Sequence, residues 1–175
     1  FVGQIIHPQE WNSSIDYENK KVAVIGSGAT AVTLIPEIAK KASHVTMIQR
    51  SPTYIASAPS KYKILHLLNY ISPKLGYKII RFTNILRQRR IYRRAMRSPE
   101  LVKDYLLSLV RDELPGFDVE KHFTPSYNPW EQRLCLAPDS DFFESINQKR
   151  VSVETETIDS FSEKGVQLDS GKLIE

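Results

Sequence analysis

The residues with the clearest chemistry form a glycine-rich turn after a short apolar run. Residues 22–25, Val-Ala-Val-Ile, are followed by Gly-Ser-Gly-Ala-Thr-Ala at 26–31. In such a turn the first glycine allows a tight bend, the second lets the backbone approach a pyrophosphate, and the small last residue lets helix and strand pack closely. The helix N-terminus then offers unpaired N–H groups to the phosphates. The turn predicts a dinucleotide site formed by Gly26, Ser27, Gly28, Ala29, Thr30 and Ala31.

The choice between the two nicotinamide cofactors depends on a position about twenty residues further along the chain. An acidic residue there would bond both ribose hydroxyls and repel a 2′-phosphate. This chain has Gln49-Arg50-Ser51 instead. A guanidinium and a hydroxyl suit a phosphate, so Arg50 and Ser51 favour NADP(H). The alternative, in which Arg50 is a solvated residue at a strand end, remains open at this point.

These residues require a strand, a helix and a second strand to position them. Residues 22–25 predict a buried strand bounded by glycine. From Thr30 the apolar residues follow helical spacing, and 44–49 predict the next strand. A strand–turn–helix–strand unit of this length is typical of a parallel sheet covered on both faces. The predicted fold class is therefore α/β, with a Rossmann-like parallel sheet.

An all-helical insert is predicted over 61–114. Its first part has Ile79, Phe82, Ile85 and Leu86 on one helix face. A second helix is predicted to begin at Ser98-Pro99, with the Ser98 hydroxyl as N-cap and proline in the first turn. Its expected apolar stripe is Leu101, Val102, Tyr105, Leu106, Leu109 and Val110. The sequence thus predicts one Rossmann-like domain made of 1–60 and 115–175, with 61–114 inserted and 1–20 as a linker.

The C-terminal third predicts smaller elements. Residues 122–138 are rich in aromatic residues and proline and predict a loop. A short helix is expected over 141–148 and a strand over 151–154. Residues 157–162 and 166–169 flank Glu-Lys-Gly, which predicts a small β-hairpin.

The overall composition sets limits on this interpretation. The chain has 175 residues, enough for one domain with an insert, and a single cysteine, Cys135, which excludes an internal disulfide framework. No run is long and apolar enough to span a bilayer, which favours a cytoplasmic location. Because the chain opens on Phe1 within a motif and ends within a strand-like pattern, we expect a segment of a longer protein.

Positive charge is concentrated in the helical insert. From Lys61 to Lys103 there are twelve Lys or Arg residues and one acid, Glu100. A nucleic-acid backbone and an anionic membrane surface are both physically possible partners. No nucleic-acid motif accompanies the charge, so we expect no nucleic-acid partner. Peripheral membrane association and a simple solvated face remain open, and the sequence does not specify an oligomeric state.

Separate motifs along the chain resemble one enzyme family. Phe1-x-Gly3-x-x-x-His7-x-x-x-Trp11 is similar to the fingerprint of the Baeyer–Villiger monooxygenases, and flavin-containing monooxygenases have a close variant. The segments 26–35, 47–54 and 127–136 resemble one branch, which includes an ethionamide-activating monooxygenase. Asn12 departs from the proline or aspartate usual after the tryptophan, which puts only the end of the fingerprint in doubt.

The resemblance implies cofactors, substrates and roles for particular residues. It implies NADP(H) bound here and FAD bound mainly by a domain absent from this chain. The expected reaction inserts one oxygen atom of O2 into a ketone, or oxidises a sulfur or nitrogen centre. By motif match Arg133 corresponds to the active-site arginine, which stabilises developing negative charge and positions the nicotinamide. His7 corresponds to the fingerprint histidine, which couples cofactor position to catalysis.

Other chemistries are less well supported by the residues. His44, His66 and His122 lack metal-ligand spacing with one another or with Cys135, so no metal is expected. Cys135 lies between leucines and is expected to be a buried small apolar residue rather than a nucleophile. A pyridine-nucleotide disulfide reductase remains an alternative, although it requires a redox cysteine pair. A non-catalytic NADP-binding or membrane-docking module is a third possibility.

Overall fold

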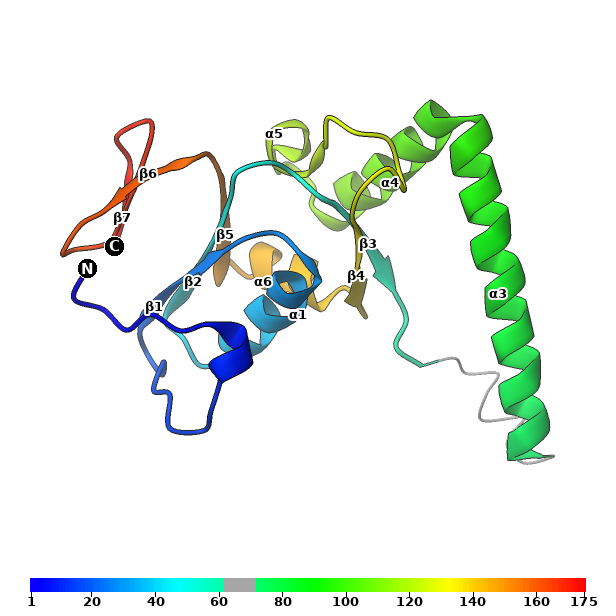
Figure 1. The fold of residues 1–175 in the computed structure, drawn as a ribbon, viewed down its shortest axis with the longest axis horizontal. Helices are drawn as coiled ribbons and strands as arrows, with labels where there is room; N and C mark the ends of the chain where they lie inside the picture. The colour runs from blue at the N-terminus through cyan, green and yellow to red at the C-terminus, as the bar shows by residue number, and fades with distance from the viewer. Residues whose placement is uncertain (62–71) are drawn as a thin grey trace.

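A computed structural model describes residues 1–61 and 72–175 (Figure 1). Three parallel strands form its principal sheet in the order β1 (Lys21–Ile25), β2 (His44–Gln49), β5 (Val151–Thr155). Helix α1 (Ala29–Ile38) connects β1 to β2, and Val22 pairs with Val45 in the parallel register. The predicted strand–turn–helix–strand unit is confirmed, as is the Rossmann-like α/β class. The predicted burial of residues 22–25 is wrong, because β1 is an edge strand of this sheet and Ile25 is 57% exposed.

A second parallel pair was not predicted. It consists of β3 (Tyr54–Ala58) and β4 (Leu134–Pro138), and Tyr54 pairs with Leu134. The predicted loop over 122–138 is therefore wrong over its last five residues, and also over its first two, which belong to a short helix, Val119–Phe123. Cys135 and Ala137 are buried while Leu136 is exposed, but all are apolar, so the alternation of a strand is invisible in the sequence.

Four more helices complete the described part of the fold: α3 (Pro73–Arg97), α4 (Pro99–Glu113), α5 (Val119–Phe123) and α6 (Asp141–Asn147). The predicted helical character of the insert is confirmed for 73–113, whereas the part over 62–71 lies outside the described residues. Ser98 is the N-cap of α4, but its side chain makes no capping hydrogen bond. The predicted stripe of α4 is partly wrong, because Leu101 and Tyr105 are exposed and Leu107 is buried.

One hydrophobic core joins the two parallel sheets. Its members come from α1, β2, β3, β4, β5 and the helices α4, α5 and α6. Leu107, Val110 and Leu114 belong to it, so the C-terminal end of the predicted insert is packed into the main core. Figure 1 shows α1 and α6 beside the strands, whereas α3 stands at the opposite end of the molecule from the C-terminal strands.

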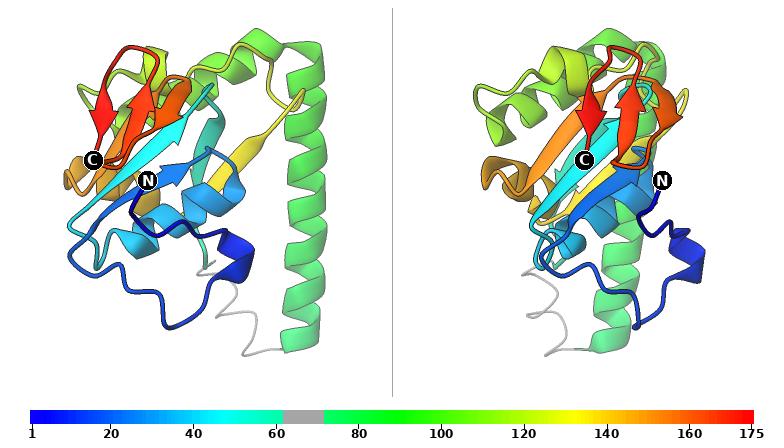
Figure 2. Two further views of the ribbon diagram at one scale, coloured as in Figure 1. Left: turned by 60° about the vertical axis from the view of Figure 1, so that its left-hand side comes forward. Right: turned by 90° about the vertical axis from the view of Figure 1, so that its left-hand side faces the viewer.

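A small antiparallel sheet covers another part of β2. It contains β6 (Ile158–Phe161), β7 (Val166–Leu168) and β8 (Leu173–Ile174). The predicted hairpin is confirmed by the β6–β7 pairing, whereas β8 was not predicted. Val166 and Leu168 pack on Ile48 of β2. The two termini lie on the same side of the molecule (Figure 2).

Candidate nucleotide-binding site

The glycine turn has the backbone geometry that its composition predicts. Gly26 follows β1 with φ of +119°, a conformation that residues with a side chain rarely adopt, and its N–H donates to the Ile48 carbonyl at 2.8 Å. Gly28 is the N-cap of α1 in an extended conformation. A Cβ added at either glycine would meet no atom within 4 Å. The space in front of the turn is therefore open.

The N-terminus of α1 is uncapped by side chains. Its first intrahelical bond runs from the Val32 N–H to the Gly28 carbonyl at 3.0 Å, so the N–H groups of Ala29, Thr30 and Ala31 have no partner within the helix. Ala29 and Thr30 are exposed, whereas Ala31 is buried in the core. The helix end can accept an anion, and Ala31 serves the close packing expected of the third small residue.

Ser27 faces inward, which its motif position alone did not reveal. Its side chain is 6% exposed, and its hydroxyl shares a 2.9 Å hydrogen bond with the Thr53 hydroxyl. The Ser27 carbonyl accepts a weak bond from the Cys135 thiol at 3.8 Å. Ser27 is thus buried, and its side chain fastens the turn to the segment before β3.

Arg50 and Ser51 lie at the same edge of the sheet as the glycine turn. β1 and β2 are parallel neighbours, with Ile25 paired to Ile48, so both strands end together. Arg50 and Ser51 are exposed just beyond Gln49. Across residues 1–61 and 72–175, no ion pair includes Arg50. Its guanidinium is available to an anion beside the turn.

A buried polar cluster surrounds Gln49, the residue before Arg50. The sequence did not predict it. Gln49 is 2% exposed, and its amide donates to the His122 carbonyl at 2.7 Å and to the Thr155 hydroxyl at 2.8 Å. That hydroxyl also shares a 2.8 Å hydrogen bond with Nδ1 of His122. The backbone carbonyl of Gln49 accepts from the Glu156 N–H at 2.9 Å. The ends of β2 and β5 and helix α5 are therefore tied together immediately before Arg50.

The electrostatics of this cluster favour a neutral imidazole. Burial lowers the pKa of His122, and the neighbouring Lys121 lowers it further. Because the Thr155 hydroxyl accepts from Gln49, its own hydrogen can be donated to an unprotonated Nδ1. One buried atom, Oε1 of Gln49, has no hydrogen-bond partner in the described part of the chain.

Arg133 ends a loop that is held by two tyrosines. The Tyr54 hydroxyl donates to the Tyr127 carbonyl at 2.7 Å, and the Tyr127 hydroxyl donates to the Arg133 carbonyl at 2.9 Å. Burial raises the pKa of Tyr54 to about 12. Inside the loop, the Glu131 carboxylate accepts from the backbone N–H of Asn128 at 2.8 Å and from its side-chain amide at 2.9 Å. Hydrogen bonds therefore fix the loop at both ends and in the middle.

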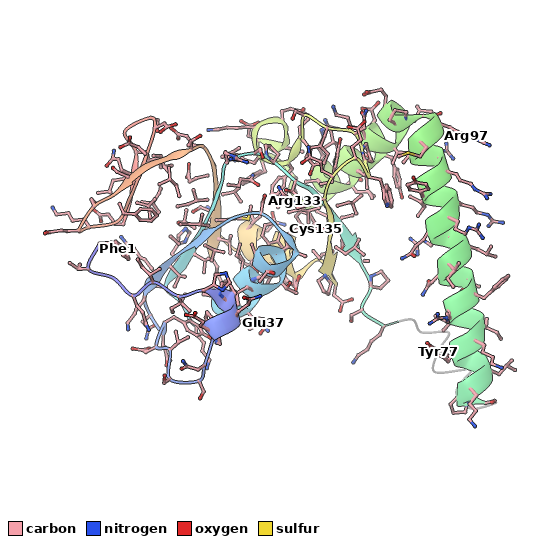
Figure 3. The ribbon with its side chains drawn as sticks, in the orientation of Figure 1. Phe1, Glu37, Tyr77, Arg97, Arg133 and Cys135 are labelled. Carbon is pink, nitrogen blue, oxygen red and sulfur yellow. The ribbon has the colours of Figure 1, made fainter. Side chains whose placement is uncertain are left out.

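The fold brings this loop to the glycine turn, although the two are far apart in sequence. Arg133 is exposed and directly precedes β4, and Cys135, two residues later, contacts the Ser27 carbonyl. In Figure 3 Arg133 and Cys135 are labelled beside the strands near α1. Trp130, in the same loop, has φ of +70°, which is strained for a bulky residue. Its ring packs edge-on against Tyr92 of α3, with centroids 6.4 Å apart.

His7 lies in a separate, exposed part of the chain. It is the N-cap of a short 3-10 helix, Pro8–Glu10, and its Nδ1 accepts a long bond of 3.4 Å from the Gln9 N–H. Trp11 packs against Tyr17 with ring centroids 5.4 Å apart. The described hydrogen bonds of the His7 side chain extend no further than Gln9. The chain by itself does not unite His7 with Arg133.

The described residues contain no cluster of three or more His, Cys, Asp or Glu side chains arranged to hold a metal ion. Cys135 is buried, and burial raises the pKa of its thiol. The expectation that Cys135 is a small buried residue is confirmed. A thiol of this kind is a poor nucleophile, because the thiolate is the reactive form.

The open glycine turn and the uncapped helix end belong to a Rossmann-type α/β unit. Comparison with known proteins identifies its relatives. The chain is 50% identical over 177 residues to the Acinetobacter baylyi protein named Probable FAD-binding monooxygenase AlmA, covering 100% of this chain and 36% of that protein. It is 49% identical over 175 residues to the FAD-containing monooxygenase EthA of Mycobacterium tuberculosis, covering 98% of this chain and 36% of that protein.

The predicted resemblance to flavin-dependent monooxygenases is confirmed: the chain is homologous to a segment of these FAD-containing enzymes. It spans only 36% of the length of these two relatives. No family model matches the sequence.

Solved structures support the fold. An oxidised steroid monooxygenase bound to NADP has a TM-score of 0.76 at 18% identity, covering 100% of this chain and 40% of that one. A cyclohexanone monooxygenase from Rhodococcus sp. Phi1 bound to NADP+ has a TM-score of 0.71 at 20% identity, with the same coverages of 100% and 40%. At such low identities the likeness establishes the arrangement of strands and helices rather than the chemistry.

Proposed function

We propose that this chain is the NADP(H)-binding part of an FAD- and NADPH-dependent monooxygenase. The observation that carries the proposal is the open space at Gly26 and Gly28, beside a helix N-terminus and an arginine that has no described ion-pair partner. A diphosphate needs close backbone approach and N–H donors, and a 2′-phosphate needs a cation at the adjacent strand end. The homology to FAD-containing monooxygenases supports the same function.

Different residues are proposed to bind different parts of NADP(H). The backbone of residues 26–28 and the N–H groups of Ala29, Thr30 and Ala31 hold the pyrophosphate, and Arg50 and Ser51 bind the 2′-phosphate. When bound, NADPH supplies a hydride to the flavin. FAD itself is bound mainly by parts of the protein outside this chain, since the segment matches only 36% of its relatives.

Arg133 is the catalytic residue of the proposal. Its backbone is fixed by Tyr127, so the exposed guanidinium can be presented at a constant position near the turn. A guanidinium keeps its charge at all physiological pH values and can stabilise developing negative charge without losing a proton. His7 is proposed to couple cofactor position to catalysis once the remainder of the enzyme packs against the exposed segment 1–11.

The proposed substrates are O2 and a small molecule with an oxidisable group. One oxygen atom enters a ketone beside its carbonyl or is transferred to a sulfur or nitrogen centre, and the other leaves as water. The simplest assay uses the whole protein with FAD and NADPH, and follows NADPH and O2 consumption with a cyclic ketone and with a thioether. Oxygenated product in stoichiometry with NADPH supports the proposal; NADPH oxidation that yields only hydrogen peroxide with every ketone and thioether contradicts it.

Cofactor selection tests the role of Arg50. In Arg50→Ala the KM for NADPH should rise more than tenfold, while the KM for NADH changes little, because only NADPH carries the 2′-phosphate. Arg150→Ala is a matched control, since Arg150 is also an exposed arginine beside a strand end of the same sheet. An unchanged preference for NADPH in Arg50→Ala would assign the 2′-phosphate to other groups.

A further inference from the structure

Within residues 1–61 and 72–175, helix α3 packs on the rest of the molecule mainly near its C-terminal end. Its packing within the chain is chiefly with α4, where Ala95 meets Val102 and Leu106. Of its 25 residues only Gly76 and Ala95 are buried. The views in Figures 1 and 2 agree that the rest of the helix runs along the edge of the molecule, away from the principal sheet.

The surface of α3 combines positive charge with large apolar side chains. The helix has nine Lys or Arg residues and no Asp or Glu. Eight large apolar or aromatic side chains on it are exposed: Leu75, Tyr77, Ile79, Phe82, Ile85, Ile91, Tyr92 and Met96. Isolated exposed apolar residues are ordinary, but such a concentration indicates an interaction surface. Figure 3 shows side chains projecting outward along α3 between the labelled Tyr77 and Arg97.

The two kinds of side chain form two neighbouring stripes along the helix. Halfway along it, one stripe changes from apolar to cationic and the other from cationic to apolar. The spacing of i, i+4 and i+7 places the members of each stripe on one face. The first stripe is apolar and then cationic: Leu75, Ile79, Phe82, Arg89, Arg93, Arg97. The second has the reverse order: Lys74, Lys78, Arg81, Ile85, Tyr92, Met96. A flat surface laid along both stripes meets cations and apolar side chains over the whole length of α3.

We propose that this face of α3 docks the protein on an anionic lipid bilayer, with the helix lying in the headgroup plane. Interfacial helices are rich in Lys and Arg and bury aromatic and aliphatic side chains at the boundary between headgroups and acyl chains. Each cation near an anionic leaflet contributes to binding, and the apolar residues add burial. Among the described helices none is long and apolar enough to cross a membrane, so the contact is a peripheral one.

Charge and apolarity together distinguish this partner from others. A nucleic-acid backbone would attract the arginines, but its charged phosphates would not bury the apolar ring of Phe82, which is 61% exposed. A second copy of the helix would bring like charges together, which opposes pairing of α3 with itself. An anionic lipid surface can both pair with the cations and bury the apolar side chains of the two stripes.

The experiment measures sedimentation of the whole FAD-loaded protein with vesicles of phosphatidylcholine, with and without phosphatidylserine. The double variant Arg89→Gln/Arg93→Gln should bind the anionic vesicles roughly thirtyfold more weakly, because two cations are lost. Phe82→Ala should weaken binding at least about tenfold. The matched control, Lys149→Gln/Lys164→Gln, loses the same charge at exposed positions outside α3 and should bind within about twofold of the parent.

Each other outcome overturns the proposal. If the protein binds neutral and anionic vesicles equally well, or if the control variant loses as much affinity as Arg89→Gln/Arg93→Gln, the α3 face is not the membrane-binding surface. Absence of vesicle binding by the whole protein means that another part of it covers α3, and a concentration-dependent dimer lost in Phe82→Ala assigns the face to a second copy. Binding to duplex DNA that is insensitive to Phe82→Ala assigns it to nucleic acid. Oxidation of a water-soluble substrate should be unchanged in all variants, so this test is independent of the proposed enzymatic function.

Discussion

The sheet edge that contains the glycine turn and the helix α3 carry the side chains of the two proposed sites, and the two regions are built in opposite ways. At the sheet edge, Ser27 and Gln49 hold the backbone near Arg50 with buried hydrogen bonds, and the Tyr127 hydroxyl holds the Arg133 carbonyl. In α3 most side chains project into solvent, and the helix is packed mainly at its C-terminal end. The first arrangement suits a ligand that must be held in one position. The second suits a broad, fluid surface, where fixed positions bring no advantage.

The largest effect is expected at Arg133. Arg133→Ala in the whole enzyme should lower the rate of oxygenation about 100- to 1000-fold, as for other removals of a charge-stabilising group, while NADPH binding is largely kept. Product formation and the KM for NADPH separate the two effects. An Arg133→Ala enzyme with ordinary turnover would sink the assignment and leave the sheet edge with a binding role alone.

Substitution by alanine should have different effects at the two glycines of the turn, which tests whether the space in front of Gly28 holds the pyrophosphate. An added Cβ at Gly28 meets only open space, so Gly28→Ala should cost less than about 1 kcal/mol of stability yet weaken NADP+ binding about tenfold or more, because the Cβ occupies the pyrophosphate space. Gly26→Ala should instead destabilise by about 1–3 kcal/mol, because φ is +119°. Denaturant unfolding and calorimetric titration of the whole protein give both quantities. Equal effects of the two variants on NADP+ affinity, with stability unchanged in both, would contradict the geometry.

The tyrosine ties can be tested by removing one oxygen atom. Tyr54→Phe keeps the buried ring but leaves the Tyr127 carbonyl without its 2.7 Å donor, so unfolding should become easier by about 1–2 kcal/mol. Tyr77→Phe on α3 is the control, because Tyr77 is exposed and its loss of a hydroxyl should change stability by less than about 0.5 kcal/mol. The comparison fails if the two variants unfold at the same denaturant concentration.

The smallest effect concerns pH. The folded-state pKa of His122 lies below its unfolded value, so near neutral pH the stabilising contribution of the neutral imidazole is fully present, and it is lost as pH falls through the unfolded and then the folded pKa. The melting temperature should therefore drop more between pH 7.5 and pH 5.5 in the parent than in His122→Asn. Parallel melting curves for the two proteins across that range would remove His122 from the acid sensitivity of the fold.

Local signals were sufficient where one element's own residues decide its structure. The strand before Gly26, the helix after it and the strand over 44–49 were all predicted, because a short run rich in β-branched residues, the helical spacing of apolar residues and a glycine turn are each visible in neighbouring residues. The strands β3 and β4 were missed for the opposite reason. Each is five residues long and bounded by a proline or by a loop rich in aromatic residues, and each is stabilised chiefly by pairing with the other from about eighty residues away.

The site was predicted in its parts but not in its assembly. The sequence pointed to Arg50 and Arg133 as candidate site residues. No local pattern indicates that Gln49 would donate a hydrogen bond to α5 or that the Cys135 thiol would contact the Ser27 carbonyl. Gln49 differs from an exposed glutamine only by what surrounds it. The inward turn of Ser27 toward Thr53 is likewise a property of the folded chain.

The amino-acid order alone determined the glycine turn, the class of the fold, the cationic character of α3 and the kinship with flavin-dependent monooxygenases, since these depend on neighbouring residues and their spacing. Only the tertiary structure decided which side chains share an edge, which of the apolar residues of α4 face the core, and that α3 keeps its apolar stripe in solvent. Hydrogen bonds and burial act between residues that are distant in sequence, and they exist only after the strands have paired.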